Sequence, residues 1–300
     1  MVNSAAIQSD VVLAEKTTFR IGGASRWYYP PATEQDCANA LQWARSENIP
    51  VFVLGNGSNV LISDKGWPGL TVNIAEQFNA ITWNGTSAEC QSGALLHRLV
   101  RDMVNNRLCG LEKLAGIPGS IGGALYMNAG AFGQTITDCV EQVTFIDMHD
   151  MLMHSLSAAE MITGYRQSSF SSGDALITSA RFCFKPADGD TAQLAFNEVL
   201  GKRKIRHPLD LPNCGSVFKN PPGTTAGTII DQCGLKGFAA GGVEVSAKHA
   251  NFIVNRHNGT AADVRSLIVH IQQEVFRQKN LLLEPEVVFV GDFEEPLFKG

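Results

Sequence analysis

A glycine-rich stretch over residues 114–133 constrains this chain more than any other feature of its sequence. It reads Leu-Ala-Gly-Ile-Pro-Gly-Ser-Ile-Gly-Gly-Ala-Leu-Tyr-Met-Asn-Ala-Gly-Ala-Phe-Gly. Glycine loses the most conformational freedom on folding and has no side chain to bury, so we expect neither a packed helix nor a packed strand here. The stretch is typical of a loop whose backbone N–H groups approach a ligand closely. An ordinary glycine-rich turn fits these residues equally well.

Two common phosphate-binding motifs do not fit this stretch. A Walker loop ends in Gly-Lys-Ser/Thr, whereas Gly122 is followed by Gly123 and Ala124, with no lysine to meet a terminal phosphate. The dinucleotide fingerprint G-x-G-x-x-G requires a spacing that Gly116, Gly119 and Gly122 do not have. The sequence therefore excludes both motifs.

A second glycine-containing loop lies earlier in the chain. The apolar run 51–54 predicts a buried strand, residues 55–59 read Gly-Asn-Gly-Ser-Asn, and 60–62 resume the apolar pattern. The Asn-Gly pair is compatible with a simple hairpin turn. However, several N–H donors together with the Ser58 hydroxyl and the Asn59 amide also suit the two negative charges of a pyrophosphate. Together the two loops favour a nucleotide cofactor held by backbone groups.

Length and composition limit the class of protein. The chain has 300 residues, 44% of them hydrophobic and 18% charged, which suits two or three domains with substantial cores. A formal charge of -5 and an isoelectric point near 5.8 argue against nucleic acid as a partner. Apolar runs are short, and the N-terminus lacks a basic region followed by an apolar stretch. We therefore expect a cytoplasmic protein without membrane insertion.

Cysteine and histidine spacing does not indicate a metal site. The seven cysteines form no C-x-x-C pair and no zinc spacing with histidine, so we expect no metal and interpret them as reduced thiols. Cys214 adjoins candidate site residues, and either a packing role or an influence on the site remains open. His149 and His154 flank an expected hairpin connection, where we interpret them as solvent-facing.

Hydrophobic periodicity predicts an α+β chain. A capping signature at Thr33 predicts a helix that ends before Pro50. The other expected helices span 95–107, 191–204, 226–233 and 260–278, and the other expected strands span 140–148, 176–184, 252–254 and 286–290. Residues 186–191 are predicted as a linker.

Motifs along nearly the whole chain resemble one known family. Residues 54–60 and 116–130 resemble the FAD-binding domain of the UDP-N-acetylenolpyruvoylglucosamine reductases. Further motifs that resemble this family occur in order at 18–23, 165–170, 215–221, 230–237, 249–252 and 283–287. Each motif alone is weakly specific, but their joint order over residues 15–292 is highly specific.

The resemblance implies a fold and a set of ligands. It implies an α+β fold with a two-part FAD-binding domain of the vanillyl-alcohol-oxidase-like type and a smaller α+β substrate domain. The corresponding parts are 1–70, 71–187 and 188–300, with the last strand packing back on the FAD domain. It further implies non-covalent FAD, NADPH as co-substrate, a UDP-sugar substrate and a monomeric protein. No lid insertion precedes residue 216, as in the shorter branch of the family.

The resemblance also assigns site residues. It assigns the cofactor contacts to Gly55, Asn56, Gly57, Ser58, Asn59, Gly116, Ile117, Pro118, Gly119, Ser120, Gly122, Gly123, Ala124 and Asn128. It assigns the substrate contacts to Tyr165, Arg203, Lys219 and Asn220, with Arg206 as an alternative to Arg203 at the phosphates. It assigns catalysis to Arg166, Ser216 and Glu286.

The implied chemistry explains these three residue types. Hydride transfer from flavin N5 to the enolpyruvyl vinyl group leaves an enolate, which needs a cation, a hydrogen-bond donor and an acid. Arg166 can hold a carboxylate through two parallel N–H bonds, Ser216 matches the proton donor, and Glu286 supports the same intermediate. Taken alone, Arg166 reads equally as a surface ion-pair residue, Ser216 as a turn hydroxyl and Glu286 as a solvated charge.

The chain departs from the family pattern at one position, and the sequence leaves two other functions open. Many members carry arginine two residues after the glutamate, whereas this chain has Val288. The alternative functions are an FAD-dependent oxidase or dehydrogenase acting on an alcohol, and a non-catalytic nucleotide-binding protein. The combination of Arg166, Ser216 and Glu286 favours the reductase, because a mere binding protein has no need for it.

Overall fold

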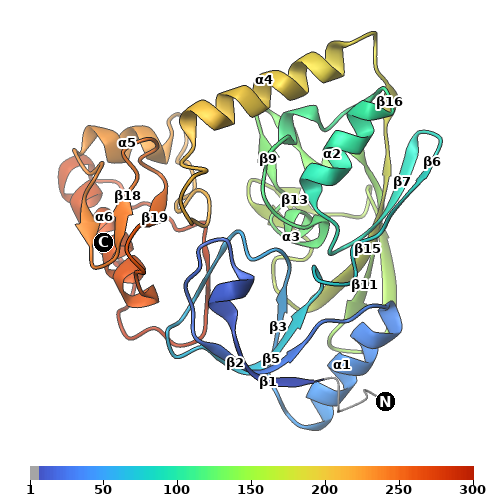
Figure 1. The fold of residues 1–300 in the computed structure, drawn as a ribbon, viewed down its shortest axis with the longest axis horizontal. Helices are drawn as coiled ribbons and strands as arrows, with labels where there is room; N and C mark the ends of the chain where they lie inside the picture. Colours follow the sequence, from blue (N-terminus) through green and yellow to red (C-terminus); the bar gives the residue numbers. More distant parts are fainter. Residues whose placement is uncertain (1–6) are drawn as a thin grey trace. The chain divides into compact units, whose positions relative to one another are not determined.

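The computed structural model describes residues 7–300, which divide into two compact units (Figure 1). Within these residues the first unit comprises 7–8, Trp27–Asn56 and Gly69–Arg203. The second unit comprises Ser9–Arg26, Gly57–Pro68 and Lys204–Gly300. The predicted parts 1–70, 71–187 and 188–300 follow the chain continuously, whereas segments 9–26 and 57–68 cluster with the C-terminal residues. Sequence pattern could not reveal this, because it reports local periodicity and not long-range pairing.

A parallel strand pair and one helix begin the first unit. Strand β3 (Val51–Leu54) pairs in parallel with β5 (Trp67–Asn73). Strand β2 (Ala24–Tyr29) enters this unit at Trp27, and β1 (Gln8–Val12) lies almost wholly in the second unit. Helix α1 (Glu34–Ser46) begins with a capping box between Thr33 and Asp36, which confirms the helix predicted there. Its buried face packs with β5 residues Leu70 and Val72.

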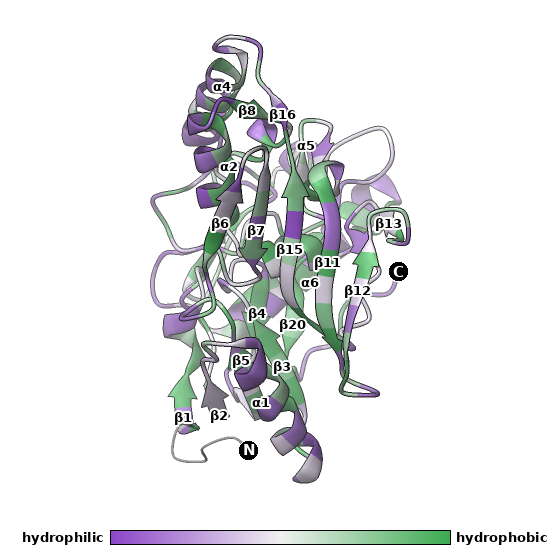
Figure 2. Ribbon diagram, turned by 90° about the vertical axis from the view of Figure 1, so that its right-hand side faces the viewer, coloured by the Kyte–Doolittle hydropathy of each residue, from purple (hydrophilic) through white to green (hydrophobic). Residues whose placement is uncertain are grey.

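An antiparallel sheet forms the larger core of the first unit. Its order is β12 (Met153–Ser157), β11 (Val140–Asp147), β15 (Ala175–Cys183), β7 (Ser87–Gln91) and β6 (Ile81–Asn84). Polar and apolar residues are mixed along β11 and β15 (Figure 2), as expected for strands with one face in a core. Helix α2 (Leu96–Asn105) contributes Leu99, Val100 and Met103 to this core. The predicted strands 140–148 and 176–184 are confirmed.

The glycine-rich stretch is not wholly a loop, which corrects the sequence prediction. Residues Ile121–Tyr126 form the short helix α3, in which Ile121 and Leu125 are buried and Ser120 accepts a hydrogen bond from Gly123 N at 3.3 Å. The cap and the two apolar anchors outweigh the low helix propensity of the two glycines.

Short elements complete the first unit. They are η3 (Glu112–Leu114), η4 (Ile136–Cys139), β8 (Leu108–Cys109), β9 (Gly130–Ala131), β10 (Gln134–Thr135), β13 (Thr163–Gly164), β14 (Gln167–Ser168) and β16 (Lys185–Pro186). Strand β16 pairs with β8, so the predicted linker at 186–191 is partly a strand. Helix α4 (Thr191–Arg206) follows it, as predicted.

The second unit is built around a long helix. Helices α5 (Ala226–Gln232) and α6 (Ala261–Lys279) accompany strands β17 (Ala239–Ala240), β18 (Val243–Val245) and β19 (Ile253–Asn255), and η2 (Leu13–Lys16) precedes them in the chain. The last strand, β20 (Val288–Val290), pairs in parallel with β4 (Val60–Ile62). No helix within residues 7–300 is long and apolar enough to cross a bilayer.

Candidate active site

The loop at residues 55–59 connects two parallel-paired strands and is not a hairpin turn. Strand β3 before it pairs with β5, and strand β4 after it pairs with β20. Gly55 packs so closely on Ser120 that a Cβ atom at position 55 would collide with the Ser120 hydroxyl. Within the first unit, Gly55 of this loop therefore contacts the glycine-rich stretch 114–133, as expected of two loops that hold one ligand.

The second half of the loop belongs to the second unit and is fixed by Thr18. Thr18 N donates to the Gly57 carbonyl at 3.1 Å, and its hydroxyl donates to the Asn213 carbonyl at 2.7 Å. Gly57 has φ +61°, and a Cβ there would meet Thr17 Cα at 2.7 Å. In a trans peptide the N–H points opposite to the preceding carbonyl, so Ser58 N–H points away from Thr18.

The loop at residues 116–124 is fixed by two backbone hydrogen bonds. Leu96 N donates to the Gly119 carbonyl at 3.0 Å, and Ile121 N donates to the Ala94 carbonyl at 2.8 Å. By the same trans-peptide geometry, Ser120 N–H points away from Leu96. In each loop, therefore, the N–H of a serine, Ser58 or Ser120, points away from the residue that donates to the carbonyl of the preceding glycine.

Gly122 and Gly123 have different environments. A Cβ at Gly122, which is buried, would lie 3.0 Å from Ser92 Cβ and 3.2 Å from Ile74 Cδ1. Gly123 is exposed, and a Cβ there would meet only Ser120 Oγ, at 3.4 Å. Gly122 is therefore a glycine for internal packing, whereas Gly123 leaves bare backbone accessible from outside.

This difference makes a prediction about cofactor binding. Gly123→Val places a branched side chain over the bare backbone, so the protein should fold but lose flavin. Gly122→Val should instead lower the free energy of unfolding by about 1–3 kcal/mol, the usual cost of overpacking a core. Visible absorbance of the purified proteins and their thermal unfolding measure the two effects. Gly201→Val is the control, because Gly201 is an exposed helical glycine with no neighbour within 4 Å. Full flavin content in Gly123→Val would refute the placement.

The Arg203 side chain contacts the start of the loop at residues 116–124. Its Nε donates to the Ala115 carbonyl at 2.7 Å, its side chain packs where a Cβ of Gly116 would project, and the residue is only 9% exposed. Burial lowers the pKa of Arg203 to about 10. This geometry favours a role in supporting the loop, and direct contact between Arg203 and a substrate stays a prediction.

Asn128 connects the glycine-rich stretch to the hairpin that carries Arg166. Its side-chain amide donates to the Gly164 carbonyl at 2.9 Å and accepts from the Thr137 hydroxyl at 3.0 Å. Tyr165 and Arg166 form the turn between β13 and β14. Arg166 has φ +55°, a conformation that is uncommon for a residue with a side chain. An observed backbone outlier of this kind is often found at functional sites.

The Arg166 side chain is partly oriented by its neighbours. Its Nη1 donates to the Gly130 carbonyl at 3.3 Å, and its guanidinium lies 5.1 Å from the centre of the Tyr165 ring. Arg166 is half-buried and Tyr165 is exposed. The first unit therefore brings this predicted cation next to the glycine-rich stretch.

In the second unit, Ser216 and Glu286 lie on adjacent backbone segments. Glu286 N donates to the Val217 carbonyl at 2.7 Å, and Lys219 N donates to the Glu284 carbonyl at 2.9 Å. Asn59 Nδ2 donates to the Glu286 carbonyl at 3.1 Å, which connects the first loop to this pair of segments. Ser216 and Glu286 are both half-buried. The predicted proton donor and its supporting carboxylate thus share one local framework.

Three further residues of this region have structural partners. The Lys219 ammonium forms an ion pair with the Glu284 carboxylate, and Asn220 Oδ1 accepts from Ala226 N at 3.0 Å at the start of α5. Cys214 is buried, and burial raises its pKa to about 12, so the thiol stays protonated at neutral pH. This favours the packing role for Cys214.

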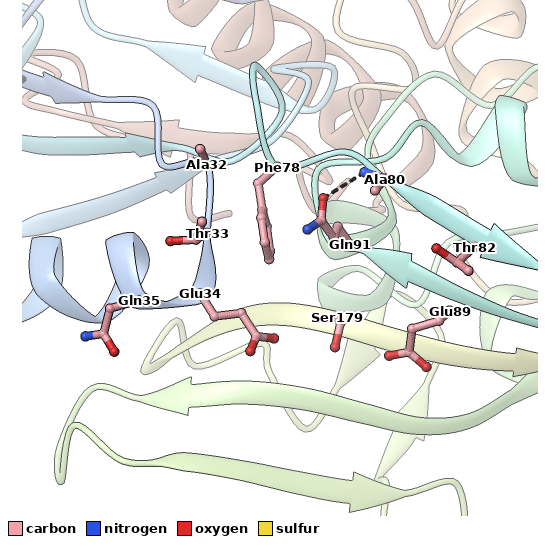
Figure 3. Close-up of a pocket in the computed structure, with 10 residues that line it drawn as sticks. All are labelled: Ala32, Thr33, Glu34, Gln35, Phe78, Ala80, Thr82, Glu89, Gln91 and Ser179. Atoms are coloured by element: carbon pink, nitrogen blue, oxygen red, sulfur yellow. Dashed lines mark hydrogen bonds between the residues drawn. The ribbon is translucent and has the colours of Figure 1, made fainter.

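A hollow of about 520 Å³ lies elsewhere in the first unit, beside the N-terminus of α1 (Figure 3). It contains none of the predicted cofactor or catalytic residues. The carboxylates of Glu34 and Glu89 line it, which disfavours a pyrophosphate there. The side chains that line it are Ala32, Thr33, Glu34, Gln35, Phe78, Ala80, Thr82, Glu89, Gln91 and Ser179. The candidate active site therefore rests on the two loops and not on this hollow.

Comparison with known proteins identifies the class. Residues 27–154 match the model of an FAD binding domain, and residues 207–290 match the model of the C-terminal domain of UDP-N-acetylenolpyruvoylglucosamine reductase. In the described residues 7–300, no three His, Cys, Asp or Glu side chains form a group that could hold a metal ion. Together with the two glycine loops, these matches define an FAD-dependent oxidoreductase.

Whole-chain relatives narrow the class to one family. The reductase of this name from Caldicellulosiruptor bescii is 40% identical over 96% of this chain and 92% of its own length, and that from a Synechococcus species is 38% identical over 98% and 94%. The crystal structure of the Thermus caldophilus enzyme superposes with a TM-score of 0.81 at 33% identity, over 95% of this chain and 99% of that one. The chain belongs to the UDP-N-acetylenolpyruvoylglucosamine reductase family.

Proposed function

We propose that this chain is an NADPH-dependent flavoenzyme that reduces the enolpyruvyl ether of UDP-N-acetylglucosamine enolpyruvate to UDP-N-acetylmuramate, a step in peptidoglycan precursor synthesis. The observation that carries the proposal is the 40% identity to a reductase of this name over 96% of the chain. We further propose that the enzyme works in the cytoplasm as a monomer.

The residues of both loops fit a flavin nucleotide. Bare backbone at Gly123 and the close approach of Gly55 to Ser120 are features that suit a pyrophosphate bound by main-chain donors. When bound there, FAD would supply the hydride-transfer chemistry, with NADPH as the proposed reductant. We propose that FAD is held without a covalent bond.

Arg166 is proposed to bind the substrate carboxylate. A guanidinium can donate two parallel N–H bonds to one carboxylate, and its charge then stabilises the negative charge that spreads onto this group as the vinyl carbon accepts hydride. Its contact with Gly130 and the Tyr165 ring reduces the freedom of the side chain before substrate binds. Less entropy is therefore lost when the substrate carboxylate is bound.

Ser216 is proposed to deliver the proton to the adjacent carbon. A hydroxyl is a weak acid, so it donates only to a strongly basic acceptor such as an enolate or in relay with another acid. Lys219 is already paired with Glu284, which weakens its electrostatic help to Ser216. Glu286 is proposed to support the same intermediate from the neighbouring backbone segment. Tyr165, Lys219 and Asn220 remain the proposed substrate contacts.

A spectroscopic and kinetic experiment tests the proposed function. The purified protein should be yellow with a flavin spectrum, and NADPH oxidation should depend on UDP-N-acetylglucosamine enolpyruvate, giving a product heavier by two hydrogens. Parallel assays with NADH and with simple alcohols distinguish nucleotide preference and the alcohol-oxidising alternative. A protein that binds no FAD after reconstitution, or that oxidises NADPH equally without the enolpyruvyl substrate, would overturn the proposal.

A further inference from the structure

The buried side chain of Asn251 pairs with the backbone of the segment that carries Ser216. Asn251 is 3% exposed. Phe218 N donates to Asn251 Oδ1 at 3.0 Å, and Asn251 Nδ2 donates to the Phe218 carbonyl at 2.8 Å. The main chain adds a third bond, from Val217 N to the Asn251 carbonyl at 2.9 Å. The carboxamide thus satisfies both polar groups of one residue, as a neighbouring strand would.

The opposite edge of the same segment is also paired. Val217 and Lys219 bond to the backbone of residues 284–287, and Phe218 forms an isolated antiparallel bridge with Pro285. The hydrogen bonds of this bridge are those of Lys219 N and Glu286 N, so the N–H and C=O of Phe218 itself face the other edge. Asn251 supplies the partners for both groups on that edge. Residues 284–287 therefore hold one edge of the segment after Ser216, and the Asn251 side chain holds the polar groups of Phe218 on the other edge.

Asn251 is itself held in place. Asn251 N donates to His249 Nδ1 at 3.2 Å, and burial lowers the pKa of His249, which favours the neutral ring that accepts this bond. The His249 ring contacts Phe252, with the ring centres 4.8 Å apart. The carboxamide consequently has a defined position from which to orient Phe218.

We propose that Asn251 is a positioning residue for proton delivery: it fixes the segment Val217–Phe218 and thereby the location of the Ser216 hydroxyl. This inference rests on the proposed function of Ser216. Asn251 is not itself a catalytic residue, because both of its polar side-chain atoms are bonded to Phe218. A displacement of about 1 Å in a reacting group can cost about 100-fold in rate, so a role without substrate contact can still be measured.

Two substitutions at Asn251 and one control test this role. Asn251→Leu keeps the branched shape at Cγ, although leucine is bulkier, and removes both hydrogen bonds to Phe218. Asn251→Ser is the milder variant, because it leaves room for water if the leucine protein does not fold. Asn255→Leu is the control: Asn255 is also buried, and its amide accepts from Gly259 N at 2.8 Å and donates to the Phe19 carbonyl at 3.3 Å, so neither bond is to the segment Val217–Phe218.

The two half-reactions provide the readout, by stopped-flow absorbance of the bound flavin. Asn251→Leu or Asn251→Ser should slow flavin reoxidation by the enolpyruvyl substrate by about 10-fold or more, within the range for misplaced groups, and leave reduction by NADPH within about twofold. Asn255→Leu should affect neither rate by more than about twofold if it folds. In the Ser216→Ala background, either Asn251 substitution should add less than about twofold, because the group it positions is gone.

The outcomes separate this inference from the proposed function. If the Asn251 variants slow both half-reactions equally, or slow reoxidation as much in the Ser216→Ala background as alone, the positioning role is overturned and Asn251 is merely structural. If Ser216→Ala is slow in reoxidation but both Asn251 variants are normal, only the role of Asn251 fails. If Ser216→Ala itself reoxidises normally, the proposed proton donor fails, and the Asn251 inference falls with it.

Discussion

Replacing Arg166 by lysine should lower turnover with the enolpyruvyl substrate by about 100- to 1000-fold, the usual cost of losing one strong donor to a developing negative charge. Lysine keeps the charge but not the planar fork that pairs with both oxygens of a carboxylate. It also loses the guanidinium contacts with the Gly130 carbonyl and the Tyr165 ring. The loss should appear mainly in flavin reoxidation, since the carboxylate belongs to the substrate.

Steady-state oxidation of NADPH, followed by its absorbance, measures this effect. Arg181→Lys is the matched control in the same unit, because Arg181 forms an exposed ion pair with Glu141 at 3.1 Å. Such surface pairs contribute about 0–1 kcal/mol, so the control should turn over normally. Near-normal turnover of Arg166→Lys would show that the substrate carboxylate has another partner.

The elements that the sequence predicted best are those whose signals are local. The capping residues of α1 and α6, Thr33 and Thr260, precede amphipathic stretches, and both helices begin directly after them. The strand runs at 140–148 and 176–184 likewise have β-branched and apolar patterns over their own length. Local propensity, packing and capping agree in these segments, which is why pattern alone was sufficient.

Long-range pairing was beyond local pattern. Residues 60–62 were correctly predicted as a strand, but their partner is β20, more than two hundred residues away in the chain. This pairing of β4 with β20 accounts for the clustering of segment 57–68 with the C-terminal unit. The helix α3 was missed because its glycines oppose helix formation, and only the cap from Ser120 and the buried Ile121 and Leu125 outweigh them.

The candidate site was predicted residue by residue from the family motifs, but not its supporting contacts. Sequence could not distinguish Gly122, which packs inside, from Gly123, which is exposed. Asn251 and Thr18 lie within motifs that were recognised, yet their hydrogen bonds to Phe218 and Gly57 depend on the folded arrangement. A polar residue followed by an apolar run, as at Asn251, is the signal that could have drawn attention to it.

Replacing Ser216 by alanine should slow flavin reoxidation by the enolpyruvyl substrate by at least about 100-fold, the low end of general-acid contributions. Reduction of the flavin by NADPH should stay nearly intact, because the proton is needed only after hydride has reached the substrate. Ser266→Ala is the control, since Ser266 is an exposed residue on α6 whose hydroxyl bonds to Glu295 at 2.6 Å. Stopped-flow absorbance reports the two steps separately.

Glu286→Gln should impair the same half-reaction as Ser216→Ala, because Glu286 lies on the backbone segment bonded to Val217 and is proposed to support the same intermediate. Glutamine keeps the shape and removes the charge, so a slow reoxidation in this variant reports electrostatics and not packing. In deuterated water the wild-type reoxidation rate should fall if proton delivery limits it, and Ser216→Ala should alter that ratio. If Ser216→Ala slowed only reduction by NADPH, Ser216 would instead be a contact for the nicotinamide.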